Sequence, residues 1–268
     1  MSKTPPKTYR TIWISDLHLG APECQAERVL DFIRRHDAEQ LYLVGDVFDG
    51  WRLKKNWHWD QLYNDVIQKL LRRARKGCQI TYIPGNHDAF VRAYDGLRLG
   101  GILIRRQAVH TTVDGRKLLV LHGDEFDSVV TTSRWLAELG SVLYAFSIRL
   151  NRRFNALRRV CGLPYWSLSA WLKHQVKNAV MFIDRFEDAV AAEAGRRQVQ
   201  GVVCGHIHRA AIRDMKGIAY YNTGDWVESC TALVEHFDGS MELVNWQHGD
   251  AESRDETAVP GQPVEALA

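Results

Sequence analysis

The chain has 268 residues, of which 46% are hydrophobic and 25% are charged. This length and composition are those of an ordinary soluble protein with a hydrophobic core, enough for one large domain or for a domain with an insertion. The formal net charge of +3 is too small to indicate a nucleic-acid partner, and none is expected.

The cysteines and the apolar runs indicate the cellular setting. The five cysteines are an odd number and none follows C-x-x-C spacing, so neither a disulfide framework nor a thiolate zinc site is expected. The N-terminal segment has no apolar stretch of the kind found in secretory signals, and no run of about eighteen apolar residues predicts a membrane span. We therefore expect a cytoplasmic protein.

The predicted elements alternate along the first half of the chain. Short apolar, β-branched runs at 11–15, 41–45, 80–84, 118–122 and 199–205 predict buried strands, and helical spacing at 26–36 and 60–75 predicts helices between the early strands. Runs at 218–224, 231–237 and 241–246 resemble consecutive strands joined by short turns, which suggests a second, more antiparallel sheet. The expected fold is α/β, with two sheets packed as a β-sandwich and flanked by helices.

The segment at 128–198 breaks this alternation, because it reads as helices on either side of a Gly-Leu-Pro turn. We interpret it as a helical cap inserted into a core formed by 9–127 and 199–247. The ends, 1–8 and 248–268, are polar or carry little periodicity, and we expect both to be flexible.

Metal-ligand residue types follow the predicted strands. They are Asp16 and His18, Asp46, Asn86 with His87 and Asp88, His122, and His206 with His208. Any one of these residues alone is best explained as a cap, turn or surface residue. Five of the eleven histidines fall into the set, however, and each follows a strand. Strand ends in such folds deliver side chains to one rim, so the set predicts a shared site.

The chemistry of these side chains points to divalent ions. Carboxylate, imidazole and amide oxygen suit Mn²⁺, Fe²⁺ or Zn²⁺. Residues two apart, such as Asp16 and His18, point to the same side if the backbone stays extended. Glycines at 45, 85, 123 and 205 allow the backbone to turn sharply beside the ions.

The motifs D-x-H, G-D-x-x-D, G-N-H-D, H-G-D and G-H-x-H resemble those of the calcineurin-like metallophosphoesterase family over residues 10 to 245. The resemblance implies that Asp16, His18, Asp46 and His208 hold one metal. It also implies that Asp46, Asn86, His122 and His206 hold the other, with Asp46 bridging the two. Two divalent ions are expected as cofactors, Mn²⁺ first and Fe²⁺ or Zn²⁺ as alternatives, and they lower the pKa of water enough to supply hydroxide near neutral pH.

The same resemblance implies catalytic roles for His87 and Asp88. His87 resembles the family's general acid, which protonates the leaving oxygen, and Asp88 is expected to orient it through a ring N–H. Asp49 and Asp124 are interpreted either as partners of the metal ligands or as simple turn residues. The expected substrate contacts are Asn86, His87, Lys177 and His206.

A helical insertion before G-H-x-H, with the late G-D-W at 224–226, resembles the UDP-2,3-diacylglucosamine pyrophosphatase branch, which acts in lipid A synthesis. The segment K-N-A-V-M-F-I-D from Lys177 resembles that branch's substrate-contacting stretch. One position departs from the branch, which reads G-N-R-D where this chain has His87. Arginine provides a fixed cationic fork, whereas histidine titrates near neutral pH, so the departure indicates a paralogue with a different phosphoester substrate.

The first half of the cap combines arginines 149, 152, 153, 158 and 159 with aromatic and leucine residues. Such a helix can bind an anionic membrane surface or phosphorylated ligands, or be merely solvated. We expect membrane contact and a peripheral position on the cytoplasmic face of the inner membrane. Trp51, Trp57 and Trp59 either shape a pocket edge or pack under the cap.

The expected function is hydrolysis of a phosphoester or pyrophosphate bond in a lipid-linked substrate. Hydrolysis of soluble phosphodiesters or phosphomonoesters, such as cyclic nucleotides, is the alternative. Exonuclease action is disfavoured by the modest charge. A non-catalytic scaffold is a different class of function, and it is disfavoured because such a protein should have lost ligands that are all present here.

Overall fold

The structure, a computed structural model, describes residues 5–127 and 168–248. Side chains are described over the same ranges except for the first part of the helix that begins at Leu168. Among these residues, no helix is long and apolar enough to cross a bilayer. The predicted cap arginines lie outside the described residues.

The first sheet has seven strands in the order β12-β11-β1-β2-β3-β5-β4. Their bounds are β1 Lys7–Ile14, β2 His36–Val44, β3 Gln79–Ile83, β4 Arg98–Leu99, β5 Ile102–Ile104, β11 Thr231–Glu235 and β12 Met241–Asn245. The strands β1, β2, β3 and β5 are parallel, and β11 joins β1 in antiparallel register. The parallel strands therefore end at one rim of this sheet.

The second sheet has five strands in the order β6-β7-β8-β10-β9. Their bounds are β6 Ala108–Thr111, β7 Lys117–Val120, β8 Gly201–Cys204, β9 Ala211–Met215 and β10 Ile218–Asn222. Parallel pairing of β7 with β8 brings together chain segments that are about eighty residues apart, Leu118 with Gly201 and Val120 with Val203. The ends of β7 and β8 therefore meet side by side.

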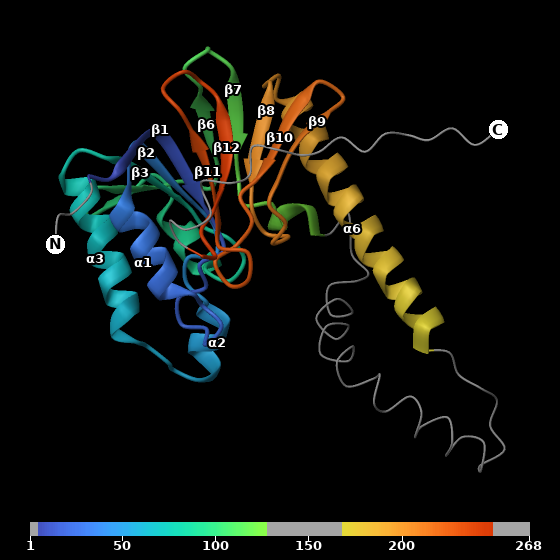
Figure 1. The fold of residues 1–268 in the computed structure, drawn as a ribbon, viewed down its shortest axis with the longest axis horizontal. Helices are drawn as coiled ribbons and strands as arrows, with labels where there is room; N and C mark the ends of the chain where they lie inside the picture. The colour runs from blue at the N-terminus through green and yellow to red at the C-terminus, as the bar shows by residue number, and fades with distance from the viewer. Residues whose placement is uncertain (1–4, 128–167, 249–268) are drawn as a thin grey trace, which may run out of the picture.

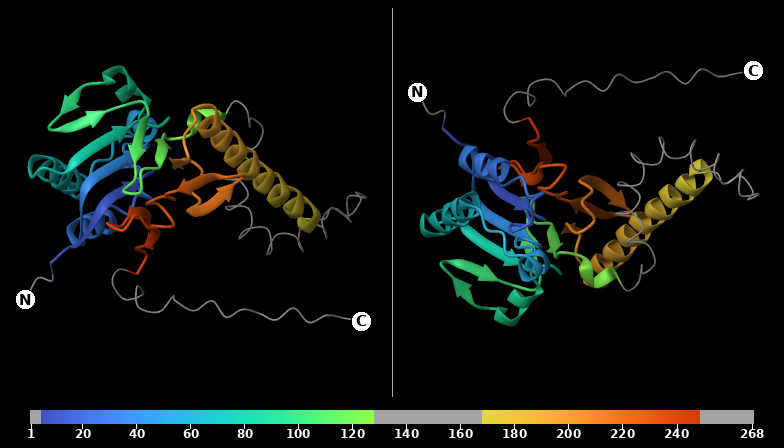
Figure 2. Two further views of the ribbon diagram at one scale, coloured as in Figure 1. Left: turned by 90° about the horizontal axis from the view of Figure 1, so that it is seen from above. Right: turned by 90° about the horizontal axis from the view of Figure 1, so that it is seen from below.

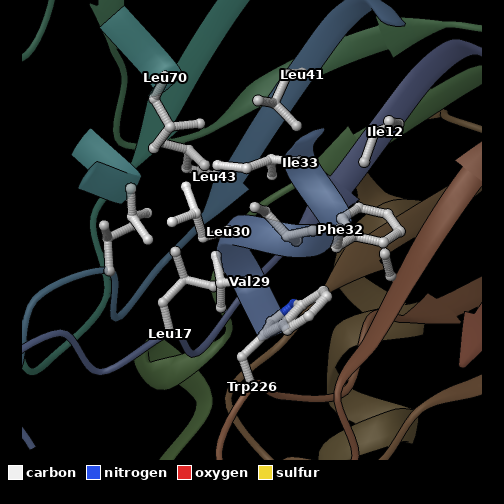
Figure 3. Close-up of a cluster of buried hydrophobic side chains, with 14 of the residues drawn as sticks. Ile12, Leu17, Val29, Leu30, Phe32, Ile33, Leu41, Leu43, Leu70 and Trp226 are labelled. Carbon is white, nitrogen blue, oxygen red and sulfur yellow. The ribbon is translucent and has the colours of Figure 1, made fainter. Parts of the chain in front are cut away.

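Helices cover the outer faces of both sheets, as Figures 1 and 2 show. The covering helices are α1 Ala26–Arg35 and α3 Gln61–Arg75 on the first sheet and α6 Leu168–Arg196 on the second. The short helix α2 Gly50–Lys55 and the 3-10 helices η1 Ala89–Tyr94 and η2 Asp124–Phe126 belong to the connections. Figure 3 shows α1 burying Val29, Leu30 and Ile33 against strand residues such as Leu41. The second half of α6 buries Phe186 and other apolar residues against the second sheet.

A separate apolar layer lies between the two sheets. Trp13 and Leu233 come from the first sheet, and Leu118 and Val203 come from the second. All four side chains are completely buried. Burial on both faces explains why these strands read as near-continuous apolar runs rather than as alternating patterns.

The expected sandwich with flanking helices is confirmed, but the expected second sheet was wrong in composition. The late strands do not form one sheet, because only β10 belongs to the second sheet, whereas β11 and β12 join the first. Every residue of β11 is buried, as suits a strand covered on both faces, and its pairing with β1 satisfies its backbone. β1 begins at Lys7, so Lys7 and Thr8, which were expected to be flexible, belong to a strand. The cap boundaries at 128 and 198 stay a prediction.

Candidate metal centre

The loops after five strands converge at one rim of the sandwich. Asp16 and His18 follow β1, and Asp46 follows β2, and these two loops are joined by backbone hydrogen bonds. The Asp16 amide donates to the Gly45 carbonyl at 3.0 Å, and the His18 amide donates to the Asp46 carbonyl at 2.9 Å. The Asp16 carboxylate accepts the His206 amide at 3.0 Å, which attaches the loop after β8.

The backbone at these residues is left-handed. Eight described non-glycine residues have positive φ, and five of them are predicted ligands, namely Asp16 at 54°, His18 at 50°, Asp46 at 49°, His206 at 71° and His208 at 53°. The extended backbone expected for the two-apart pairs is therefore wrong. Such conformations cost on the order of 1–3 kcal/mol each and persist where the surroundings enforce them, most often at functional sites.

Asp16, His18 and His208 form the first set of donor atoms, all within 4.8 Å of one another. His208 Nε2 lies 3.2 Å from Asp16 Oδ1, and His18 Nε2 lies 3.9 Å from the same oxygen. His206 and His208, although two residues apart, face different sets.

Asp46, His122 and His206 form the second set, again within 4.8 Å. His122 Nε2 lies 3.4 Å from Asp46 Oδ2 and 3.3 Å from the amide oxygen of Asn86. The other ring nitrogen of His122, Nδ1, lies 3.0 Å from the Val44 carbonyl. Donation of an Nδ1 proton to that carbonyl leaves Nε2 free to face a metal.

Asp46 faces both sets. Its Oδ2 lies 3.9 Å from His18 Nε2 of the first set and 3.4 Å from His122 Nε2 of the second. Its other oxygen, Oδ1, accepts the His87 amide at 2.8 Å, so the side chain is fixed in this position. The geometry suits the bridging role that the sequence predicted for Asp46.

The donor atoms have the properties that a cation site requires. Within the described residues, Asp16 Oδ1, His18 Nε2 and Asp46 Oδ2 are buried and make no hydrogen bond. A buried carboxylate oxygen without a hydrogen bond is costly unless a cation is bound to it. The residues present therefore fit divalent ions of the borderline type.

The pKa shifts in the site arise because buried carboxylates and histidines lie close together. Burial alone would lower the pKa of His122, but Asp46 and Asp16 raise it to about 10. Burial likewise opposes the charged form of His208, yet Asp16 raises its pKa to about 9. Burial would raise the pKa of Asp16, but the surrounding histidines hold it far below its ordinary value. The carboxylates thus attract positive charge strongly, and a metal would supply that charge.

His87 lies beside the two sets, next to Asp49. Its Nε2 is 4.0 Å from Asp46 Oδ2, and its Nδ1 is 3.1 Å from Asp49 Oδ1. The second oxygen of Asp49 lies 3.4 Å from His18 Nδ1, so one carboxylate contacts both rings. Burial would raise the pKa of Asp49, but hydrogen bonding to His18 and His87 holds it well below its usual range.

The orientation of His87 by Asp88, expected from the sequence, is corrected by this arrangement. Asp88 is buried, and its Oδ2 accepts the Val47 amide at 2.7 Å and the Tyr82 hydroxyl. Its Oδ1 accepts the Gly85 amide at 2.6 Å. Asp88 therefore fixes the loops after β2 and β3, while Asp49 takes the place beside His87.

Two glycines leave room for the metal ligands. A Cβ on Gly45, where φ is +85°, would lie 2.0 Å from the His122 ring. A Cβ on Gly85 would lie 2.2 Å from Asp46 Oδ1 and 2.6 Å from His122. Since Gly85 does not have a positive φ, its role is close approach rather than conformational freedom.

Some residues that the sequence did not assign to the site contact it in the structure, and some that it did assign lie elsewhere. Asp127 Oδ1 lies 2.7 Å from His206 Nε2. Trp51 stacks on His87 with ring centroids 3.9 Å apart, and its role at a pocket edge stays a prediction. Asp124 pairs with Arg92 at 2.7 Å instead of with a ligand. Lys177 falls in α6, but its side chain lies outside the described part.

Comparison with known proteins agrees with this geometry. A UDP-2,3-diacylglucosamine hydrolase of Cellvibrio japonicus is 36% identical over 208 residues, covering 75% of this chain and 82% of that protein. One from a Shewanella species is 28% identical over 238 residues, covering 86% and 95%. Residues 9–210 match the family model described as calcineurin-like phosphoesterase. The chain therefore belongs to the calcineurin-like phosphoesterase family and is a metal-dependent hydrolase.

Proposed function

We propose that the protein is a dinuclear-metal hydrolase that cleaves a pyrophosphate bond in a lipid-linked substrate similar to UDP-2,3-diacylglucosamine. The observation that carries the proposal is the pair of donor sets with Asp46 facing both. The printed names of the relatives support the substrate class. Such a substrate lies at a membrane, so we propose a peripheral position on the cytoplasmic face of the inner membrane.

The donor sets suggest how two ions would be held. Asp16, His18, Asp46 and His208 would bind one, and Asp46, Asn86, His122 and His206 would bind the other. Divalent ions supply positive charge for the phosphate groups and lower the pKa of water. Mn²⁺ is the ion we propose first, with Fe²⁺ or Zn²⁺ as alternatives, because imidazole and carboxylate suit all three.

The remaining residues of the site prepare proton transfer to the leaving oxygen. His87 is half-buried, and its Nδ1 faces the Asp49 carboxylate at 3.1 Å. The nearby carboxylate attracts this edge of the ring, and Nε2 lies on the Asp46 side of the site, 4.0 Å from Asp46 Oδ2. We propose that His87 protonates the leaving oxygen and that Asn86 and His206 help to hold the phosphate group. Lys177 remains a proposed substrate contact.

Metal counting tests the dinuclear centre without relying on turnover. Wild-type protein dialysed against Mn²⁺ should bind about two ions per chain, as the family chemistry requires. Asp46→Asn should lose both ions, because Asp46 faces both donor sets. His208→Ala should lose only one. Equal loss in the two variants, measured by elemental analysis, would contradict the bridging role.

Turnover of UDP-2,3-diacylglucosamine tests the substrate class. Hydrolysis of its pyrophosphate gives a nucleoside monophosphate and a lipid-linked sugar phosphate, which thin-layer chromatography separates. We expect Mn²⁺-dependent release of both products. Elimination of turnover in His87→Ala would support the role of His87, with surface variant Asp114→Asn as the control.

A second function, hydrolysis of soluble phosphodiesters or phosphomonoesters, is favoured by one observation. The position that carries arginine in the resembled lipid A branch is His87 here, and it is paired with Asp49. A histidine so paired suits proton donation to a poor leaving group rather than fixed phosphate binding. Higher kcat/KM for a cyclic nucleotide than for the lipid-linked substrate would select this second function.

A further inference from the structure

The helix α2 and the loop after it present an exposed aromatic and basic surface beside the metal centre. We define the α2 surface as Trp51, Arg52, Lys54, Lys55 and Trp57. Trp51 is 55% exposed and Trp57 is 73% exposed, unusual values for the largest apolar side chain. The ring of Phe90, 55% exposed, lies next to Gly50 and extends the apolar area toward η1.

The positive charge of this surface is largely uncompensated. Among the described residues, Lys54 and Lys55 take part in no ion pair. Arg52 lies 3.4 Å from Glu23, but both side chains are more than half exposed, so water screens that pair. Lys54 and Lys55 therefore carry positive charge that no acidic side chain of the described residues neutralises, beside two indoles that are each more than half exposed.

The α2 surface is fixed to the catalytic loop. Asp49 caps the helix by accepting the Arg52 amide at 2.9 Å, and the Gly50 amide donates to the His87 carbonyl at 3.1 Å. The indole of Trp51 stacks on His87. A molecule that binds Trp51 of α2 therefore lies next to His87, the residue proposed to protonate the leaving oxygen.

We propose that the α2 surface docks on an anionic lipid bilayer. Indole rings prefer the boundary between headgroups and acyl chains, and lysine and arginine there bind anionic headgroups. The helix has only six residues, which suits shallow contact rather than insertion of an amphipathic helix. The reason for docking rests on the proposed lipid-linked substrate, whose phosphates would then reach the metal centre from the membrane.

Vesicle co-sedimentation of the full chain tests this surface without turnover. We expect binding to phosphatidylcholine vesicles that contain phosphatidylglycerol and much weaker binding to phosphatidylcholine alone. Lys54→Gln/Lys55→Gln should reduce partitioning about 25-fold, since each basic residue near an anionic surface contributes about fivefold. Adding Trp57→Ala to this double variant should reduce partitioning into the vesicles further, because the indole no longer enters the interface.

Matched variants on other faces serve as controls. Arg98→Gln/Arg105→Gln removes two exposed charges from the β4–β5 hairpin, and Phe237→Ala removes an exposed aromatic residue near β11. These variants should bind vesicles as wild type does. Circular dichroism melting identifies any variant that fails to fold, and Arg52→Gln then provides a second test of the charge.

Wild-type protein that does not bind anionic vesicles would overturn the proposal, as would equal losses in the α2 and control variants. Preferential binding of single-stranded RNA by the α2 surface would overturn it in favour of base stacking on the indoles. Mn²⁺-dependent turnover of UDP-2,3-diacylglucosamine in detergent micelles by wild type, assayed in parallel, reports on the proposed function independently of vesicle binding. Vesicle binding without turnover would leave docking supported and the proposed reaction rejected.

Discussion

His87 lies between two unlike neighbours, the carboxylate of Asp49 and the indole of Trp51. The carboxylate lies 3.1 Å from one ring nitrogen, and the stacked indole limits rotation of the ring plane. Because Asp49 also contacts His18, one side chain positions both a proposed metal ligand and the proposed acid. Asp49 is therefore a candidate positioning residue for both rings.

Replacement of Asp49 tests this shared positioning. Asp49→Asn should lower kcat/KM for a phosphodiester by about 10- to 100-fold, the usual effect of losing a group that orients a metal ligand. The double variant with His87→Ala should lose little more than the larger single loss, because the two residues act as a unit. Steady-state kinetics with Asp114→Asn as control checks this, and additive losses would contradict it.

The close approach at Gly85 gives a second residue-scale prediction. Gly85→Ala places a Cβ against Asp46 and His122, so both side chains must shift. We expect loss of bound metal and of activity, while the far-ultraviolet circular dichroism spectrum is retained. Gly195→Ala is the matched control, because a Cβ there meets nothing within 4 Å and alanine favours a helix. Equal metal content in the two variants would contradict the prediction.

The sequence was sufficient to identify the ligand candidates but not their supporting partners. Ligands follow strands, and strand ends are visible as the points where apolar runs stop. Asp127 supports His206 across 79 residues of chain, a contact that depends on β7 and β8 lying side by side. Asp88 was assigned to its sequence neighbour His87, but burial directs it to backbone amides instead.

At the scale of elements, strand and helix positions followed from periodicity, while sheet membership did not. The helix α1 spans Ala26–Arg35 and α3 spans Gln61–Arg75, in agreement with the runs expected at 26–36 and 60–75. The strand β11 was assigned to the wrong sheet, because its apolar residues suit either sheet equally. In the structure it pairs with β1, and its buried Glu235 accepts a hydrogen bond from the Thr11 hydroxyl of β1, a contact that periodicity does not reveal.

Glu235 links β11, β1 and β6 and gives the element-scale prediction. Its carboxylate lies 2.7 Å from Arg10, 3.0 Å from His110 and 2.8 Å from the Thr11 hydroxyl. Burial would raise the pKa of Glu235, but these hydrogen bonds, His110 first, lower it to about 2 from the ordinary 4.5. Because the pKa is lower in the folded state, the ionised carboxylate stabilises the fold fully above pH 4.5, and this contribution is lost as the pH falls toward 2.

Glu235→Gln should therefore lower the free energy of unfolding by about 2–3 kcal/mol at neutral pH. The difference from wild type should narrow as the pH falls from 4.5 toward 2, because the carboxylate of the unfolded wild-type chain takes up a proton while that of the folded chain stays ionised down to about pH 2. Urea unfolding at several pH values measures this. Glu242→Gln, an exposed side chain on the edge strand β12, is the control and should change stability little. A pH-independent difference would show that the network acts through packing alone.

At the scale of the whole molecule, the metal centre joins the two sheets. The ligands Asp16, His18 and Asp46 follow strands of the first sheet, whereas His122, His206 and His208 follow strands of the second. Ions held by both groups would bind the folded sandwich and not the unfolded chain. Ligand binding to the folded state alone raises stability by mass action.

Metal addition should consequently raise the melting temperature of the whole protein. At a Mn²⁺ concentration near a hundred times Kd the gain is about 2.7 kcal/mol for each ion bound, which corresponds to roughly 5–10 °C per ion for a protein of this size. The gain should be larger at pH 8 than at pH 6, because metal must displace protons from His122 and His208, whose pKa values are about 10 and 9. Scanning fluorimetry with and without chelator measures the shift. An equal shift in Asp46→Asn, or a shift that shrinks as pH rises, would place the stabilising ions elsewhere in the protein.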